Sequence, residues 1–502
     1  MTTIRDAFDE TVQKIDEAKE AFRPNLASRE VGKIISVSSG IVRARGLPHV
    51  GFSELVRLSE TLYGLVFNVE ANALGIIPLG DCSTLRTGDE IERTGRVMDV
   101  PVGPELLGRV INPLGEPLDE KGPVNASARL PVERPAHPIV DRSPVEVPLQ
   151  TGIKIIDALV PVGRGQRELI LGDRKTGKTS IAIDTILNQR NQNVICIYCA
   201  ISQRAASVAK SINLLRQKGA MEYTVVVVSG GDDPSGLNFI APYAATSIGE
   251  YFMEQGRDVL IVYDDLIQHA NYYREISLLL KRPPGRAAFP GDIFYVHSRL
   301  LERATHLRPE LGGGSLTALP IVETEAQNMS AYIATNLISI TDGQIYLSPT
   351  HFSLGVLPAV DVSKSVSRVG GKAQLPAYRQ VAGPLKLAYA QSEELEEFAR
   401  FGARVGEQSQ KIIERGRRIR ACLKQAELSP VPTFDQIVIL LALSEGLLDS
   451  IPVEKIAAAQ VAMCRPEVIP AGIRESVEKT GKLSDSDKQS IISSVQKALA
   501  FV

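Results

Sequence analysis

The feature that most constrains this chain is the octapeptide Gly172-Asp173-Arg174-Lys175-Thr176-Gly177-Lys178-Thr179, which matches the pattern G-x-x-x-x-G-K-T at every fixed position. The apolar run RELILG precedes it, and the helix-forming stretch SIAIDTILNQ follows it. A glycine-rich turn between a strand and a helix is the setting in which this pattern folds as a phosphate-binding loop. Its glycines let backbone N–H groups turn inward onto phosphate oxygens. The octapeptide therefore predicts a P-loop, residues 172–179, that holds a nucleoside triphosphate.

A P-loop of this kind implies a magnesium ion. Lys178 is expected to reach the β- and γ-phosphates, and the Thr179 hydroxyl to ligate Mg²⁺. An acid at the end of another buried strand should hold the metal shell, and the segment DVLIVYDD supplies two candidates. Asp264 directly follows the apolar run, so we expect it to act on the metal through water. Asp265 is predicted to cap the next helix instead.

Hydrolysis needs one more group, which orients or deprotonates the attacking water. In P-loop ATPases of this layout a glutamate usually sits just past the strand that follows the P-loop helix. Here that strand, NVICIYCA, is followed by Ile201-Ser202-Gln203-Arg204, and the next acid is Glu222. Gln203 can orient water but cannot take its proton. The sequence therefore predicts a site that binds Mg-ATP without rapid turnover.

Composition argues against two other classes of protein. The net charge of -2, the absence of Trp and the 5% aromatic content give no electrostatic or stacking basis for nucleic-acid binding. No apolar run approaches the ~20 residues of a membrane-spanning helix. The N-terminus, MTTIRDAFDE, has acids early and lacks the apolar core of a signal peptide. We therefore expect neither nucleic acid as a partner, nor a signal peptide, nor a transmembrane segment.

Hydropathy patterns divide the chain into four segments. Residues 1–26 read as an amphipathic helix with Ile4, Phe8, Val12, Ile15 and Phe22 on one face. Residues 27–98 show short alternating apolar runs with Gly and Pro between them, which is typical of a small antiparallel β-barrel. Residues 99–375 alternate strands and helices, which indicates a mostly parallel sheet covered on both faces. Residues 376–502 lack strand patterns and predict a helical domain.

Several long stretches together resemble the α subunits of the rotary F-type ATP synthases over nearly the whole chain. They are TGIKIIDALVPVGRGQRELILGDRKTGKTSIAID, YDDL, SLLLKRPPGRAAFPGDIFYVHSRLLERA, GSLTALPIVET, ISITDGQIYL and SVSRVGG. The resemblance implies a six-stranded β-barrel, a RecA-like α/β nucleotide-binding domain and a C-terminal α-helical bundle. It also implies a regulatory, non-catalytic subunit, with Mg²⁺ and ATP or ADP bound, in a translocating enzyme that makes ATP from an ion gradient or pumps ions by hydrolysis.

The resemblance further implies partners and a location. Three such chains are expected to alternate with three β subunits in an α3β3 ring around a γ shaft. The N-terminal helix is expected to meet a δ-type subunit of the peripheral stalk. The enzyme is expected to lie peripherally on the cytoplasmic face of the inner membrane, or on the equivalent face in an organelle.

Particular residues acquire roles from the same resemblance. Arg368, in SVSRVGG, matches an arginine finger that enters the neighbouring β site, and Gln203 stands where β carries its catalytic glutamate. Gln425 is expected near the adenine. The family's usual Arg-Pro reads Leu357-Pro358 here, and its second glutamine near the base reads Glu427, so base selectivity is left open. The segment 303–315 is shorter than usual, and we expect it near rotor-facing loops on the phosphate side.

Two alternatives remain from the residues alone. A self-sufficient motor ATPase of the export or secretion type would need a glutamate near position 203, where the chain has glutamine. A ring-shaped nucleic-acid translocase should have basic and aromatic residues lining the barrel, whereas residues 31–97 have balanced charge and few aromatics.

Overall fold

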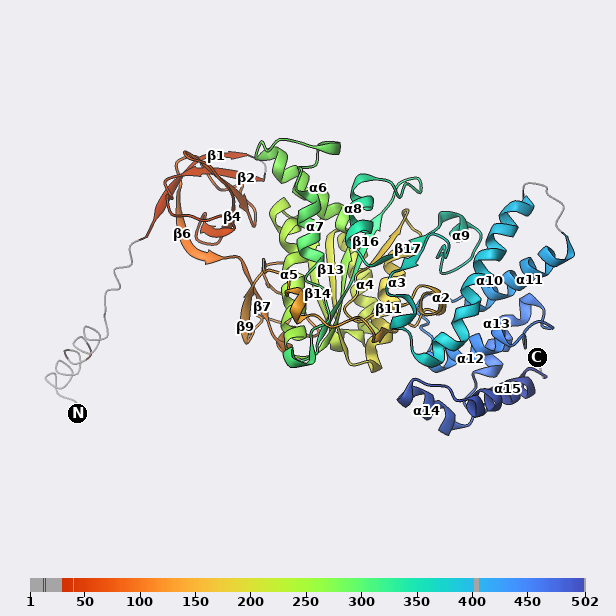
Figure 1. The fold of residues 1–502 in the computed structure, drawn as a ribbon. Coiled ribbons are helices and arrows are strands. Elements are labelled where there is room, and N and C mark those ends of the chain that lie inside the picture. The colour runs from red at the N-terminus through yellow and green to blue at the C-terminus, as the bar shows by residue number, and fades with distance from the viewer. Residues whose placement is uncertain (1–11, 13, 15–28, 39, 401–405, 501–502) are drawn as a thin grey trace.

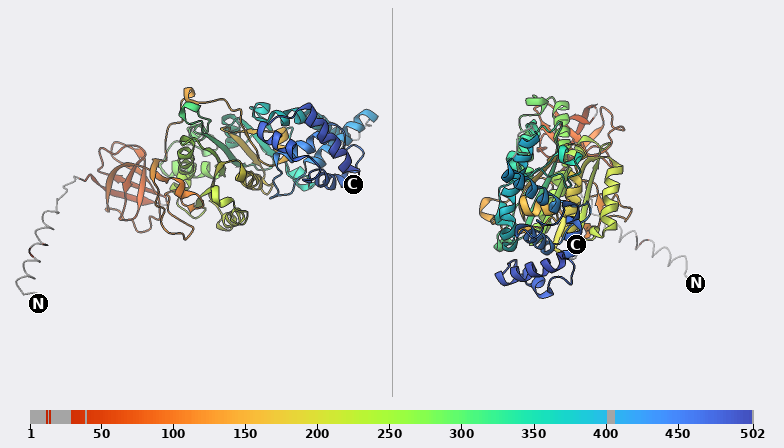
Figure 2. Two further views of the ribbon diagram at one scale, coloured as in Figure 1. Left: turned by 90° about the horizontal axis from the view of Figure 1, so that it is seen from below. Right: turned by 90° about the vertical axis from the view of Figure 1, so that its right-hand side faces the viewer.

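The computed structural model describes residues 12, 14, 29–38, 40–400 and 406–500, and these form three domains that follow one another along the molecule (Figures 1 and 2). The predicted helix over residues 1–26 falls almost entirely outside the described residues. The first domain is a closed antiparallel barrel with strand order β1-β2-β5-β4-β3-β6. Its strands are β1 (Val31–Ser38), β2 (Ile41–Arg45), β3 (Glu54–Arg57), β4 (Tyr63–Val69), β5 (Leu74–Pro78) and β6 (Glu90–Val97).

Alternation of side chains gives the barrel two apolar surfaces. Val42, Val56, Val66 and Ile76 point inward and are fully buried. Their neighbours Ile41, Leu55, Leu65, Phe67 and Ile77 point outward and join the core of the next domain. The barrel is therefore held to the central domain by apolar packing, because period-two alternation puts one set of residues on each face.

The central domain is built on an eight-stranded sheet with order β18-β17-β12-β16-β15-β13-β14-β8. All of its strand pairs are parallel except β17 with β18. Its strands are β8 (Val110–Ile111), β12 (Glu168–Gly172), β13 (Val194–Gln203), β14 (Thr224–Gly230), β15 (Asp258–Asp264), β16 (Ser315–Glu323), β17 (Gly343–Leu347) and β18 (Val366–Ser367). Two small sheets accompany it, β7 (Asp99–Val102) with β9 (Ala128–Pro131) and β10 (Pro148–Leu149) with β11 (Val162–Gly163).

Helices cover both faces of this sheet. One face packs against α2 (Lys154–Leu159), α3 (Lys178–Asn188) and α4 (Ala205–Gln217), and against the C-terminal domain. The other face packs against α5 (Ser235–Glu254), α6 (Leu266–Leu279), α7 (Ile293–Leu301) and α8 (Tyr332–Ile340). Cys196 and Cys199 belong to opposite faces of β13, and both are fully buried. The C-x-x-C spacing therefore contributes to two cores rather than to one redox or metal site.

A short helix, α9 (Pro349–Ser353), precedes the C-terminal domain, whose described residues form six α-helices. These are α10 (Pro376–Arg400), α11 (Glu407–Leu423), α12 (Thr433–Ser444), α13 (Ile456–Met463), α14 (Ala471–Thr480) and α15 (Asp485–Leu499). Their apolar faces continue the cluster that lines one face of the sheet, through α2 and α10. The predicted fold class, with barrel, α/β domain and helical bundle in that order, is confirmed.

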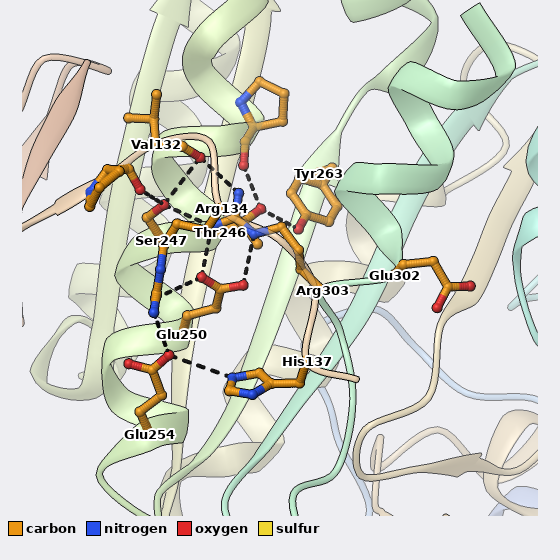
Figure 3. Close-up of polar contacts among 12 residues, drawn as sticks. Val132, Arg134, His137, Thr246, Ser247, Glu250, Glu254, Tyr263, Glu302 and Arg303 are labelled. Atoms are coloured by element: carbon orange, nitrogen blue, oxygen red, sulfur yellow. Dashed lines mark hydrogen bonds and ion pairs between the residues drawn. The ribbon is translucent and has the colours of Figure 1, made fainter. Parts of the chain in front are cut away.

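A buried ionic network fixes the segment that follows the barrel and β9 (Figure 3). Arg303 is 1% exposed, and its guanidinium donates to both carboxylate oxygens of Glu250 at 2.7 and 2.8 Å. It also donates to the Ser247 hydroxyl and to the Val132 carbonyl, each at 2.8 Å. Arg134 donates to Glu250 at 2.9 Å. The network thus ties residues 132–134 to α5 and to the end of α7.

One expectation about the fold is wrong. The segment from 303 to 315 connects α7 to the first residue of β16, where His306 pairs with Ser315. Ser315 is also in register with Asp258, the first residue of β15. The segment therefore lies at the edge where the parallel strands begin, opposite the P-loop, and not on the phosphate side. A connection that leads into a parallel strand must lie at that edge.

Candidate nucleotide-binding site

The P-loop joins the end of β12 at Gly172 to the start of α3 at Lys178. Gly177 has φ 96°, a left-handed conformation that glycine adopts without strain. At Gly172 a side chain would lie 2.7 Å from the Leu347 carbonyl of β17, so glycine is required for close packing there. The Lys178 ammonium donates to the carbonyls of Gly172 and Asp173 at 2.9 and 2.7 Å. The lysine is therefore held over the loop, where phosphate would lie.

The predicted metal-holding residues converge beside the P-loop. The Thr179 hydroxyl donates to Asp264 Oδ2 at 2.9 Å, and the Tyr198 hydroxyl donates to the same oxygen at 2.9 Å. The Gln203 amide donates to Asp264 Oδ1 and to its backbone carbonyl, both at 3.3 Å. Thr179, Gln203 and Asp264 thus come from α3, β13 and β15 to one point at the carboxyl edge of the sheet, where ligands of such sheets bind.

Burial at this point disfavours the charged form of each ionisable side chain. Burial raises the pKa of Asp264 and lowers the pKa of Lys178. Burial and the neighbouring Asp264 raise the pKa of Asp265 to about 7. Asp265 accepts from the Gln268 amide at 2.9 Å and caps α6, as the sequence predicted. The hydroxyl and carboxylate oxygens of Thr179 and Asp264 are the donors that a hard divalent ion such as Mg²⁺ prefers.

Two other residues of the P-loop hold the loop itself, and a third lies at its rim. Asp173 accepts from the Thr324 hydroxyl at 2.6 Å and from the Gln327 amide at 3.0 Å. Thr176 donates to the Asp173 carbonyl at 2.8 Å. Arg174 is largely exposed and forms an ion pair with Glu323 at 2.7 Å. The structure therefore gives Asp173 and Thr176 a bracing role and leaves Arg174 at the rim.

A small cavity lies beside Thr176 and Gly177, where α3 faces Phe352 of α9 and the loops that hold residues 357–359 and 425–427. Gln425 is only 8% exposed there. Its side-chain oxygen accepts from the backbone N–H of Lys154 at 3.0 Å. Its side-chain NH₂ donates to the backbone carbonyls of Gly152 and Ser429 at 2.8 and 2.9 Å. Glu427 lines the same cavity and accepts from the Ser180 hydroxyl at 3.1 Å. Gln425 thus lies at the predicted pocket, but its side chain forms hydrogen bonds with backbone groups.

Arg368 lies at the other edge of the sheet. It follows β18, in which Ser367 pairs with Gly343 at the start of β17. Gly343 in turn pairs with Glu168 at the start of β12. The P-loop begins at Gly172, at the opposite end of β12, so the two edges are about 13 Å apart along the strand. The Arg368 side chain is exposed, and its guanidinium makes one long contact of 3.4 Å with the Ile338 carbonyl. This chain's own P-loop is therefore not the natural target of Arg368.

Sequence reasoning missed two residues that act at the site. Tyr198 stands in the apolar run of β13, so it was indistinguishable from a core residue, yet its hydroxyl contacts Asp264. Glu323 ends β16, next to β12, and its charge acts on Lys178 and Asp264. The rule that polar residues ending parallel strands share one edge could have found Glu323. Nothing in the sequence distinguished Tyr198.

Comparisons with known proteins agree with this geometry. Three family models of the ATP synthase alpha/beta family match the chain: its beta-barrel domain at residues 27–95, its nucleotide-binding domain at 152–367 and its C-terminal domain at 374–498. Together they span all three domains of the structure.

Curated relatives match over nearly their full length. ATP synthase subunit alpha 2 of Albidiferax ferrireducens is 66% identical over 99% of this chain and 93% of its own length. ATP synthase subunit alpha 1 of Shewanella frigidimarina is 62% identical over 98% of this chain and 96% of its own. ATP synthase subunit alpha 1 of Chlorobium luteolum is 61% identical over 99% of this chain and 98% of its own. The chain therefore belongs to the ATP synthase alpha/beta family, and within it to the α subunits.

Proposed function

We propose that this chain is the regulatory, non-catalytic α subunit of an F-type ATP synthase, and that it supplies one residue to catalysis on a neighbouring β subunit. The assembly makes ATP from ADP and phosphate with a transmembrane ion gradient, or pumps ions by hydrolysing ATP. The observation that carries the proposal is the separation of Arg368 from the chain's own P-loop: the exposed arginine and the phosphate loop lie at opposite edges of one sheet.

Nucleotide is held at the P-loop with magnesium. Lys178 is positioned to meet the β- and γ-phosphates, and Thr179 and Asp264 to hold the ion, Asp264 through water. The ion would offset phosphate charge and favour the ionised form of Asp264, which burial disfavours. Gln203 offers an amide in place of a general base, so bound ATP or ADP is retained rather than turned over.

Arg368 acts in trans. A guanidinium that enters a neighbour's site offsets the charge that builds on the transferred phosphoryl group. The backbone N–H of Arg368 donates to the Asp342 carbonyl at 2.8 Å, which fixes where the residue leaves β18. The side chain beyond that anchor is exposed, so it is free to reach across an interface.

The specific partners follow from the same assignment. We propose an α3β3 ring around a γ shaft, with residues 1–26 docking on a δ-type stalk subunit. The ring would lie peripherally on the cytoplasmic face of the membrane or its organellar equivalent. Among the described residues, none of the helices is both long and apolar enough to cross a membrane.

The experiment is to assemble the α3β3γ complex with Arg368→Ala and to measure multi-site ATP hydrolysis and nucleotide bound per α chain. We expect the rate to fall by roughly 10³-fold or more while nucleotide bound to α is unchanged. Lys364→Ala, which removes an exposed cation just before β18 and four residues before Arg368, is the matched control and should leave the rate unchanged. A normal rate in the Arg368→Ala complex would refute the role in trans.

A further inference from the structure

Glu168, the first residue of β12, is a buried acid with no role in the nucleotide site. It is 0% exposed, and in the described part of the chain no cation forms an ion pair with it. The side-chain NH₂ of Gln166 donates to Glu168 Oε2 at 2.7 Å, whereas Oε1 has no hydrogen-bond partner among the described residues. Burying an unpaired charge is so costly that such a group binds a proton instead.

The charged groups around Glu168 leave it neutral. Burial and the negative charge of Asp342 raise the pKa of Glu168 well above its usual range. The positive charges of Arg368 and Lys386 act in the opposite direction, but both side chains are exposed, and water screens exposed charges. The guanidinium of Arg167, the next residue toward the N-terminus, donates to the Asp342 carboxylate at 2.9 Å instead. We therefore expect Glu168 to keep its proton at neutral pH.

The Glu168 carboxyl group lies against the strand that carries Arg368. Glu168 pairs with Gly343 of β17, and Gly343 pairs on its other side with Ser367 of β18. A side chain at Gly343 would lie 2.5 and 2.8 Å from the two carboxyl oxygens of Glu168, and closer still to the Val366 carbonyl oxygen. The carboxyl group therefore fills the space that glycine leaves open, where it is a neighbour of the backbone of β18.

A protonated carboxyl group can bind partners on two strands at once. Its O–H can donate to a carbonyl such as that of Val366, while its other oxygen accepts from Gln166. Gln166 also donates to the Ser367 hydroxyl at 3.3 Å. An ionised Glu168 has no hydrogen to donate, so its oxygen would repel the neighbouring carbonyl. Gln166 and a neutral Glu168 thus brace the two residues that precede Arg368.

We propose that Glu168 is a positioning residue of the arginine finger: in its protonated form it seats β18 on β17, and so fixes the point from which Arg368 reaches the neighbouring subunit. The inference rests on the proposed role of Arg368 in trans and adds the group that aims it. The backbone N–H of Arg368 is anchored on Asp342, and its guanidinium makes one long contact with Ile338. The position of the guanidinium therefore depends on how firmly β18 is seated, and a misplacement of about 1 Å can cost 10²-fold in rate.

The test substitutes Glu168 in the α3β3γ complex, and measures kcat and KM of multi-site ATP hydrolysis together with the nucleotide bound per α chain. Glu168→Gln has the shape of the protonated acid and offers both a donor and an acceptor, so we expect kcat to stay near the native value. Glu168→Leu fills a similar space with neither. It should lower kcat by roughly 10- to 100-fold while KM and bound nucleotide stay unchanged. If the Leu complex does not assemble, Glu168→Met takes its place.

A double substitution separates positioning from a general loss of stability. Glu168→Leu should have no further effect on kcat in the Arg368→Ala complex, because the group that Glu168 aims is already gone. A further fall by the same factor would overturn the positioning role. Glu393→Leu is the matched control: it removes another buried acid, beside Ser348 at the opposite end of β17, and should leave kcat unchanged.

The proton on Glu168 has a readout of its own. The infrared difference spectrum between the native and Glu168→Gln full-length chains at pH 8 should contain the carbonyl band of a protonated carboxyl group. Absence of that band, or a Gln complex as slow as the Leu complex, would overturn the protonated form, and a normal kcat with Leu or Met would overturn the inference as a whole. A normal rate in the Arg368→Ala complex would instead refute the finger itself, so the two failures are distinguishable.

Discussion

Glu250 is the residue whose loss should most clearly destabilise the central domain. Its side chain is 2% exposed, and it balances Arg303, which is 1% exposed and receives no other carboxylate contact in this network (Figure 3). Glu250→Gln keeps the shape but removes the charge, so the Arg303 guanidinium is left buried without a counter-ion. Breaking a buried pair in this way costs about 3–5 kcal/mol.

The matched control is Glu254→Gln, one turn further along α5. Glu254 accepts from Arg134 at 2.7 Å, but the two side chains are 30% and 25% exposed. An ion pair in that setting contributes about 0–1 kcal/mol, because water screens it. The two variants thus remove the same group from the same helix at two levels of burial.

Hydrogen exchange of amides in α5 and β15, followed by mass spectrometry, measures the free energy of opening for this domain. We expect exchange to be roughly 10²- to 10⁴-fold faster in Glu250→Gln, and nearly unchanged in Glu254→Gln. The double variant Glu250→Leu/Arg303→Met should recover most of the loss, since it removes both charges together. Equal effects of the two single variants would refute the reasoning that burial decides the cost.

Three further predictions concern single side chains. Burial and the nearby Asp361 raise the pKa of Glu393 to about 7. The folded state therefore binds this proton more tightly than the unfolded chain does, and the free energy of unfolding falls as the pH rises from 4.5 to 7. Glu393→Gln should therefore stabilise the chain by about 3 kcal/mol at pH 8 and not at pH 4, measured as the difference in hydrogen-exchange protection of α10. Burial lowers the pKa of His297 to about 4, so its contribution to stability is present above pH 6.5 and is lost as the pH falls to 4. Between pH 6.5 and pH 4 the free energy of unfolding of His297→Leu should fall by about 3 kcal/mol less than that of the native chain. Parallel curves of unfolding free energy against pH for the two proteins would contradict this. Lys178→Ala should weaken nucleotide binding at least about 100-fold in calorimetry while thermal unfolding stays within a few degrees.

The site was predicted best where sequence spacing alone sets the position. The P-loop needs only its own glycines and the elements beside it, so residues 172–179 and their strand–helix setting could be predicted. Asp264 and Gln203 each end a parallel strand, and such ends meet at one edge of the sheet. Their convergence on Thr179 follows from that topology.

Contacts between distant residues could not be predicted in the same way. Gln425 was expected to face the base, but the carbonyl of Gly152 and the amide of Lys154 engage it from far away in the sequence. Glu250 and Arg303 pair across 53 positions, and their charge pattern is no different from that of a solvated helix face. These hydrogen-bond partners depend on which buried polar groups the tertiary fold brings together.

The central claim is that this chain holds a nucleoside triphosphate without hydrolysing it. The most direct measurement loads the isolated full-length chain with γ-labelled ATP, removes free nucleotide, and follows release of labelled phosphate. We expect the bound label to remain as triphosphate for many minutes, because Gln203 supplies no base and Arg368 lies at the far edge of the sheet. Conversion of the bound nucleotide to diphosphate within seconds would contradict it.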